Sequence, residues 1–166
     1  MPRVSIALPD PWIMVDVDDL TDDQLAALPA GAGEVRKLLA ATATQLADRA
    51  VGFLALRVSP SGDGPQPTGL ITMTLDRSDA ADLENVAARV KREFAAVDYR
   101  MLGDDRYVVG VSTGSDERAF VRGDFRLIAD GLLLTVWSTI VVLEDGESEQ
   151  QVVDAIVTSL RLSMED

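Results

Sequence analysis

The chain has 166 residues, and its 28 Asp and Glu against 15 Lys and Arg give a formal charge of -13 at pH 7. It contains no histidine and no cysteine, which excludes His-based catalytic triads, thiol catalysis and thiolate metal sites. The negative charge would repel nucleic acids and anionic membrane surfaces, so we expect neither as a partner.

The chain length and the distribution of apolar residues further limit the class of protein. The apolar content of 47% fits a single domain over residues 1–166 with one core. No apolar window approaches the roughly 18 residues of a membrane span, and the first apolar run is too short for a signal peptide. We therefore expect a cytoplasmic protein.

The first third of the chain contains extended and then helical patterns. Apolar residues alternate over 4–8 and recur over 12–17 around a proline-containing turn, which predicts two strands joined by a tight turn. A capping box at residues 21–24 predicts a short helix that ends near Pro29. Helical spacing over 34–50 predicts a longer amphipathic helix.

A hairpin and a helix follow. Residues 51–58 are apolar on both alternating faces, which predicts an interior strand. A loop rich in Gly, Pro and Ser over 59–67 joins it to a strand over 69–76. Ser78 or Asp79 then caps a helix. The apolar face of that helix consists of Leu83, Val86, Ala87, Val90 and Phe94.

The last part of the chain predicts an antiparallel meander and a closing helix. The extended segments cover residues 99–102, 106–113, 117–128 and 132–143. Turn residues separate them, and an Asp-Gly pair marks the last hairpin. A second capping box at 148–151 begins a helix. Its inward-facing residues are Val152, Val153, Ile156, Val157 and Leu160.

This order predicts an α+β protein, an α/β/α sandwich around a central antiparallel sheet of about six to seven strands. An extended Leu-Pro-x-x-Trp phrase lies at 8–12, and a long apolar strand, an acidic turn and an Ile-x-x-Ser-Leu helix end follow over 137–160. In these features the chain resembles the Mog1/PsbP-like superfamily, and in particular actinobacterial domains of the LpqN/LpqT lipoprotein type. Those lipoproteins are anchored through a cysteine, which this chain lacks.

The resemblance implies a non-enzymatic binding domain, because members of the superfamily include a GTPase-binding factor, a photosystem subunit and effector chaperones. Our first hypothesis is a protein-binding domain, such as a chaperone or adaptor of a bacterial secretion or effector system. We expect a protein partner, with a homodimer as an open alternative, and no enzyme activity or cofactor. The alternatives are a domain that binds a small apolar ligand and, less favoured, a carboxylate-dependent hydrolase.

Three groups of residues carry the site hypotheses. Five aspartates near the first helix could bind calcium, but they lack the EF-hand spacing, so we interpret them as a solvated connection and predict no metal site. They are Asp16, Asp18, Asp19, Asp22 and Asp23.

Arginines on one face of the third meander strand form the second group. Arg118, Arg122 and Arg126 share one face of the predicted strand over 117–128. Guanidinium groups bind carboxylates and phosphates, so this row is a candidate anion or acidic-peptide site. Cross-strand pairing with Asp124 and other acids on a solvated face is the alternative that we favour.

Hydroxyl and aromatic side chains on the last long strand form the third group. Thr135, Trp137 and Thr139 share one face, and Thr72 and Thr74 share the mixed face of an earlier strand. Such a face could form a partly open groove for a peptide or small ligand. The favoured alternative is that Trp137 is a core residue beneath a helix.

Overall fold

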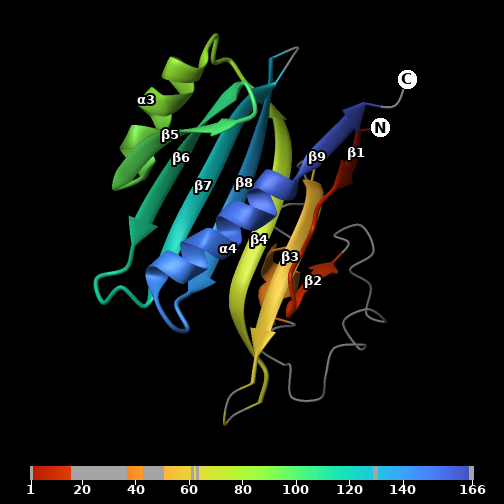
Figure 1. Ribbon diagram of the computed structural model, residues 1–166, viewed down its shortest axis with the longest axis vertical. Coiled ribbons are helices and arrows are strands. Elements are labelled where there is room, and N and C mark those ends of the chain that lie inside the picture. Colours follow the sequence, from red (N-terminus) through yellow and green to blue (C-terminus); the bar gives the residue numbers. More distant parts are fainter. Residues whose placement is uncertain are drawn as a thin grey trace.

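The computed structural model contains a seven-stranded antiparallel sheet with a helix on each face (Figure 1). It describes residues 2–15, 37–42, 51–60, 62, 64–128 and 131–164. The strands are β1 (Pro2–Ser5), β2 (Trp12–Val15), β3 (Val51–Ser59), β4 (Gln66–Arg77), β5 (Ala96–Leu102), β6 (Asp105–Thr113), β7 (Ala119–Ile128), β8 (Leu132–Val141) and β9 (Arg161–Met164). The helices with described bounds are α3 (Leu83–Glu93) and α4 (Gly146–Ser159). The α+β class and the antiparallel sheet are thereby confirmed.

The strand order of the large sheet is β2-β3-β4-β8-β7-β6-β5. The predicted β3–β4 hairpin and the predicted meander from β5 to β8 are both present. Strand β4 joins the two units by pairing with β8. The turn residues in the sequence did not predict that β4 and β8 are neighbours in the sheet.

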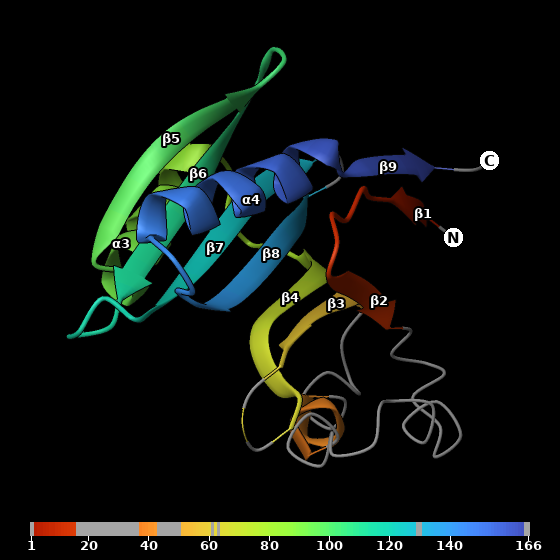
Figure 2. The ribbon, with the colours of Figure 1, turned by 60° about the horizontal axis from the view of Figure 1, so that its bottom comes forward.

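The N-terminal strands form, but they do not pair with each other. The turn between them is present, since the Trp12 amide donates to the Pro9 carbonyl over 2.9 Å. Strand β2 pairs with β3 at one edge of the large sheet, whereas β1 pairs with β9 in a separate two-stranded sheet. Strand β9 was not predicted. Figure 2 shows this small sheet at one end of the molecule with the two ends of the chain beside each other, and its residues Val4 and Leu162 pack against the main core.

The two faces of the large sheet carry separate apolar clusters. The α4 face includes Phe53, Ile71 and Phe120 from the sheet, packed against Val153 and Ile156 of the helix. The apolar cluster on the α3 face contains fewer buried residues than the cluster on the α4 face. The α3-face cluster contains Val86, Ala87, Val90 and Phe94 from the helix segment, together with Val108, Phe125 and Leu133 from the sheet.

Both helices begin at residues that differ from the predicted caps. The N-cap of α3 is Asp82, whose carboxylate accepts from the Asn85 amide over 2.9 Å, whereas the Ser78 hydroxyl accepts from the Ala80 amide in the preceding turn. Helix α4 begins after Asp145, three residues before the predicted box. In each case the cap is an aspartate, because its carboxylate reaches the free amide three residues on.

Asp145 also shows the electrostatic effect of capping. Its carboxylate accepts from both the amide and the hydroxyl of Ser148, each over 2.8 Å. These hydrogen bonds from Ser148 lower the pKa of Asp145 below 3.8, because they stabilise the ionised form.

A buried ion pair attaches the start of α4 to the sheet. A guanidinium nitrogen of Arg57 on β3 lies 2.6 Å from a Glu149 carboxylate oxygen, and both side chains are almost completely buried. Arg57 also donates to the carbonyls of Thr68 and Val141, and it lies 5.5 Å from the centre of the Trp12 ring. Because its donors have partners, the pair fixes the helix start over β3 and β4.

Some predictions fall outside the described residues. The short helix after residue 21 and the aspartate group lie there entirely. Of the helix predicted over 34–50, residues 37–42 are helical, and Leu39 within them is buried. Across the part of the chain that the structure describes, no helix has the length and apolar character needed to cross a membrane.

Candidate functional site

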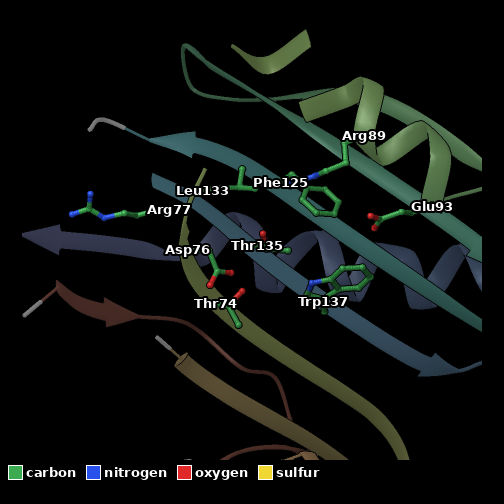
Figure 3. Close-up of a pocket in the computed structure, with 9 residues that line it drawn as sticks. All are labelled: Thr74, Asp76, Arg77, Arg89, Glu93, Phe125, Leu133, Thr135 and Trp137. Carbon is green, nitrogen blue, oxygen red and sulfur yellow. The ribbon is translucent and has the colours of Figure 1, made fainter. Parts of the chain in front are cut away.

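An open cavity of about 220 Å³ lies on the α3 face, between α3 and strands β4, β7 and β8 (Figure 3). We call it the α3-face pocket. It is lined by Thr74, Asp76, Arg77, Arg89, Glu93, Phe125, Leu133, Thr135 and Trp137. Its volume is below the roughly 300–1,000 Å³ of pockets for drug-sized ligands, so a molecule that fits inside it is small.

The pairing of β4 with β8 creates the floor of this pocket. Thr72 lies opposite Trp137, and Thr74 lies opposite Thr135. Residues directly opposite each other on antiparallel strands point to the same face. The two threonine-bearing segments that the sequence placed far apart therefore meet on one face.

An aromatic cluster forms one wall. The Trp137 ring stacks on Phe94 with centroids 5.5 Å apart, and Phe125 meets it edge-on at 5.9 Å. Gly110 and Gly123 are cross-strand partners below these rings. A Cβ at Gly110 would lie 2.6 Å from Phe94, so only glycine lets that ring rest on the sheet backbone.

The Thr74 hydroxyl is a buried group of the pocket without a described hydrogen-bond partner. Thr74 is only 1% exposed, and its hydroxyl oxygen has no hydrogen-bond partner in the described part of the chain. A buried hydroxyl without a partner costs about 1–3 kcal/mol, so such groups are uncommon in native proteins. The oxygen is almost inaccessible, so a ligand that supplies the missing partner must also shift a neighbouring side chain of the pocket wall.

Charged side chains surround the opening. Figure 3 shows Asp76 beside Thr74 on β4 and Glu93 reaching from α3 toward the aromatic rings. Arg89 lines the same wall of α3, one helical turn before Glu93, whereas Arg77 extends away from the other lining side chains. The groups directed at the opening thus include two carboxylates and one guanidinium.

The predicted threonine and tryptophan site is only partly reproduced. Thr135 is buried in the pocket wall, and Trp137 is half-buried there, so it is both a packing residue beneath α3 and a pocket residue. Thr139 does not line the pocket. It lies opposite Leu70, farther along β8, and is exposed.

The predicted arginine row is separated by the structure. Arg118 precedes β7, which begins at Ala119, and its side chain is 84% exposed beside Asp116. Arg122 is completely buried beneath α4. Arg126 lies on the same face as Arg122 and borders a different pocket. The three arginines therefore do not form one anion site.

Arg122 is held by a buried network that the alternation pattern could not show. It makes a bidentate pair with Asp124, with contacts of 2.9 and 2.7 Å. It also lies 2.6 Å from Asp154 and donates to Gln150 over 3.1 Å, both on α4. Pairing with Asp124 is as anticipated, but the predicted solvated setting is wrong because α4 covers this face.

Asp124 is the described carboxyl whose pKa is raised. Burial raises the pKa of Asp124, and Asp154 nearby adds to this, while the ion pair with Arg122 opposes it. Burial also raises the pKa of the nearby Tyr107 hydroxyl. Asp124 lines neither pocket described here, and it is engaged by Arg122 on both oxygens. Nothing in this geometry exposes it to a substrate.

Sequence reasoning missed the residues that α3 contributes. Asp76 could have been found, since it continues the alternation of Thr72 and Thr74 on β4. Arg89 and Glu93 are spaced by four on α3, but only the position of the helix over the sheet brings them to the pocket. Among the described residues no group of three or more carboxylates could hold a metal ion.

Comparisons with known proteins give little guidance. No family model matches the chain, and no curated protein matches it significantly. One solved structure, of a protein from Bacteroides thetaiotaomicron, shares 10% sequence identity and a TM-score of 0.47. The match covers 98% of this chain and 46% of that one, so this chain spans less than half of that protein.

Proposed function

We propose that the protein binds a small organic amine in the α3-face pocket. The observation that carries this proposal is the Thr74 hydroxyl, which is buried without a partner among the described residues, in a threonine that lines an open aromatic cavity. An ammonium group donates hydrogen bonds and accepts none, so it can use the hydroxyl oxygen as an acceptor.

Two further features favour a cation. The carboxylates of Asp76 and Glu93 are directed at the opening. Of the two lining arginines, Arg77 extends away from the other lining side chains, and the chain as a whole has a formal charge of -13. The half-buried indole of Trp137 offers a π surface that attracts cations by about 0.5–2 kcal/mol. The aromatic wall suits the apolar part of the same ligand.

Replacing Thr74 with Val will weaken amine binding by about 10–100-fold while leaving the protein at least as stable. The affinity loss reflects a hydrogen bond to a charged group, worth about 1.5–3 kcal/mol. Stability is expected to rise by about 1 kcal/mol, because an unpartnered hydroxyl is replaced by a methyl group of similar shape. Calorimetric titration with benzylamine, benzyl alcohol and benzoate measures the affinities, and urea unfolding measures stability.

Ser138 supplies a matched control. Its hydroxyl is also buried without a described partner, but it points to the α4 face, opposite Arg122. Ser138→Ala should therefore leave amine affinity unchanged. Equal binding of the three probes, or equal amine affinity in Thr74→Val and wild type, would contradict the proposal.

A second candidate function is the binding of another protein at the β5 edge. Strand β5 is the last strand of the sheet, and no other described strand pairs with its outer edge. Tyr99 and Met101 share one face of β5, and Met101 is 60% exposed. An extended segment of a partner could add to this edge as a further strand. The resemblance to the Mog1/PsbP-like superfamily supports this candidate by analogy only.

The Met101→Lys substitution should abolish binding of the partner protein at this edge, because it places a charge in the apolar part of the contact. Met14, which is 54% exposed on the opposite edge strand, provides the control. Affinity capture with quantitative mass spectrometry should recover the same partner with wild type and Met14→Lys, and lose it with Met101→Lys. Recovery of identical proteins by all three baits, or of none, would oppose this candidate.

A further inference from the structure

A second pocket lies on the opposite face of the sheet and does not overlap the α3-face pocket. We call it the α4-face pocket. It has a volume of about 450 Å³, within the range of sites that hold drug-sized ligands. It is surrounded by the β5–β6 turn, the end of β7, the start of β8, the end of α4 and the start of β9. The lining residues are Leu102, Gly103, Asp105, Arg126, Ile128, Leu134, Leu160, Arg161 and Leu162.

The walls of this pocket are mainly aliphatic. Leu134 and Leu160 are core residues with almost no exposure, and they form its inner surface. Leu102, Ile128 and Leu162 are partly exposed around them. A hydrocarbon chain placed here would replace water against an apolar surface, which is favourable in proportion to the area covered.

Arg126 places a positive charge in this apolar setting. It is half-buried and lies opposite Leu134, and within the described residues its guanidinium has no hydrogen bond or ion pair. By contrast, Arg57, Arg100 and Arg122 each have a carboxylate within 4.0 Å. Among the described arginines that are not exposed, Arg126 is the one without a carboxylate within 4.0 Å, so no described acid neutralises it in this apolar setting.

Arg161, the second arginine of the pocket, has a guanidinium that is held in place by hydrogen bonds but has no described carboxylate within 4.0 Å. Arg161 donates from one guanidinium nitrogen to the carbonyls of Thr158 and Leu160, over 2.7 and 3.0 Å. These bonds hold its guanidinium at the end of α4 beside the cavity. Asp105 is the acid of the lining, and it lies more than 4.0 Å from either guanidinium, since no ion pair joins them.

We propose that the α4-face pocket binds a monocarboxylate with an aliphatic chain. The carboxylate pairs with Arg126, whose planar guanidinium offers two parallel donors, and Arg161 adds positive charge at the rim. The chain lies against Leu134 and Leu160. The ligand needs both a carboxylate and an aliphatic chain. The aliphatic walls alone would not select a charged group, and the arginines alone would bind any anion.

The probe is octanoate, compared with octanol and octylammonium for the head group and with acetate for the chain. Titration calorimetry and ligand-observed NMR on the full chain should show one saturable site for octanoate. Octanol, octylammonium and acetate should each bind at least about tenfold more weakly, since each lacks one of the two contacts.

Arg126→Met keeps the length and packing of the side chain but removes its charge, and should weaken octanoate binding at least about tenfold. Arg126→Lys should retain part of the affinity. Arg118→Met, at an exposed arginine before the same strand, should bind as wild type does. Thermal unfolding of each variant verifies that the fold persists, and Arg161→Met gives a second test if Arg126→Met unfolds.

Three results would overturn the proposal. They are no saturable octanoate binding up to millimolar concentration, equal binding of octanoate and octanol, and full octanoate affinity in a folded Arg126→Met variant or, if that variant unfolds, in Arg161→Met. Thr74→Val should leave octanoate binding unchanged. The result therefore does not depend on whether the α3-face pocket binds amines.

Discussion

Replacing Arg122 with Met will lower the free energy of unfolding by about 3–5 kcal/mol, as measured by urea denaturation. The substitution leaves Asp124 completely buried without the guanidinium that contacts both of its oxygens. A carboxylate without a counter-charge in such a site is strongly destabilising. Asp154 is less affected, because it is one-third exposed and also contacts Arg100.

Two variants separate this charge effect from the loss of a long side chain. Arg126→Met makes the same chemical change on the same strand and face, where no described acid is left behind, and should change stability by less than about 1 kcal/mol. The double variant Arg122→Met/Asp124→Leu should recover most of the loss, because no buried charge remains. Equal effects of Arg122→Met and Arg126→Met would show that the pair does not matter for stability.

The deficit of Arg122→Met should also shrink as the pH falls. Without Arg122, the pKa of Asp124 rises further above its unfolded value near 3.8, since burial then acts without the opposing ion pair. A carboxyl whose pKa is raised by folding binds its proton more tightly in the folded state, so stability increases as the pH falls through that raised pKa. Unfolding curves from neutral pH down toward 4 should therefore converge on the wild type.

Replacing Phe94 with Ala will cost about 3–5 kcal/mol of unfolding free energy, the usual range for deleting a buried aromatic ring. Phe94 closes the end of α3 over the sheet and contacts both Phe125 and Trp137. The variant should also weaken amine binding, because Trp137 loses the ring on which it stacks. Chemical denaturation and benzylamine titration test the two effects separately.

A double-mutant cycle with Gly110 tests whether close packing is the cause. In the wild type, an added Cβ at Gly110 would lie 2.6 Å from Phe94 and 2.7 Å from Val90. Gly110→Ala should therefore cost about 1–3 kcal/mol, and less in the Phe94→Ala background, where one contact is gone. Gly62→Ala, with no atom within 4 Å of the added carbon, should be neutral. Additive effects at positions 94 and 110 would contradict this account.

The local parts of the fold could be predicted because their signals are local. The meander from β5 to β8 follows from alternation and turn residues, and the Asp-Gly pair before β8 is one such turn. Strand β9 has only four residues and follows α4 directly, so no pattern announced it. Its partner β1 lies at the other end of the chain, and only tertiary structure brings the two together. The Mog1/PsbP-like assignment stays a prediction.

The site was harder to predict than the fold because burial depends on distant elements. Alternation correctly placed Arg122 and Arg126 on one face of β7. It could not show that α4 covers Arg122 with Gln150 and Asp154, or that Arg126 borders a cavity. Similarly, Trp137 belongs to both a core and a pocket. The boundary between core and pocket is set by Phe94, the residue that follows the end of α3 and stacks on Trp137.

The ladder between β1 and β9 has a consequence for folding kinetics. Its residue pairs, such as Val4 with Leu162, join positions almost a whole chain length apart. The entropy lost in closing so long a loop is recovered only after the intervening sheet is compact, so this ladder should form late. As a short ladder outside the main sheet, it should also open first. Amide exchange in β1 and β9 would then report local opening well below the global unfolding free energy of the molecule.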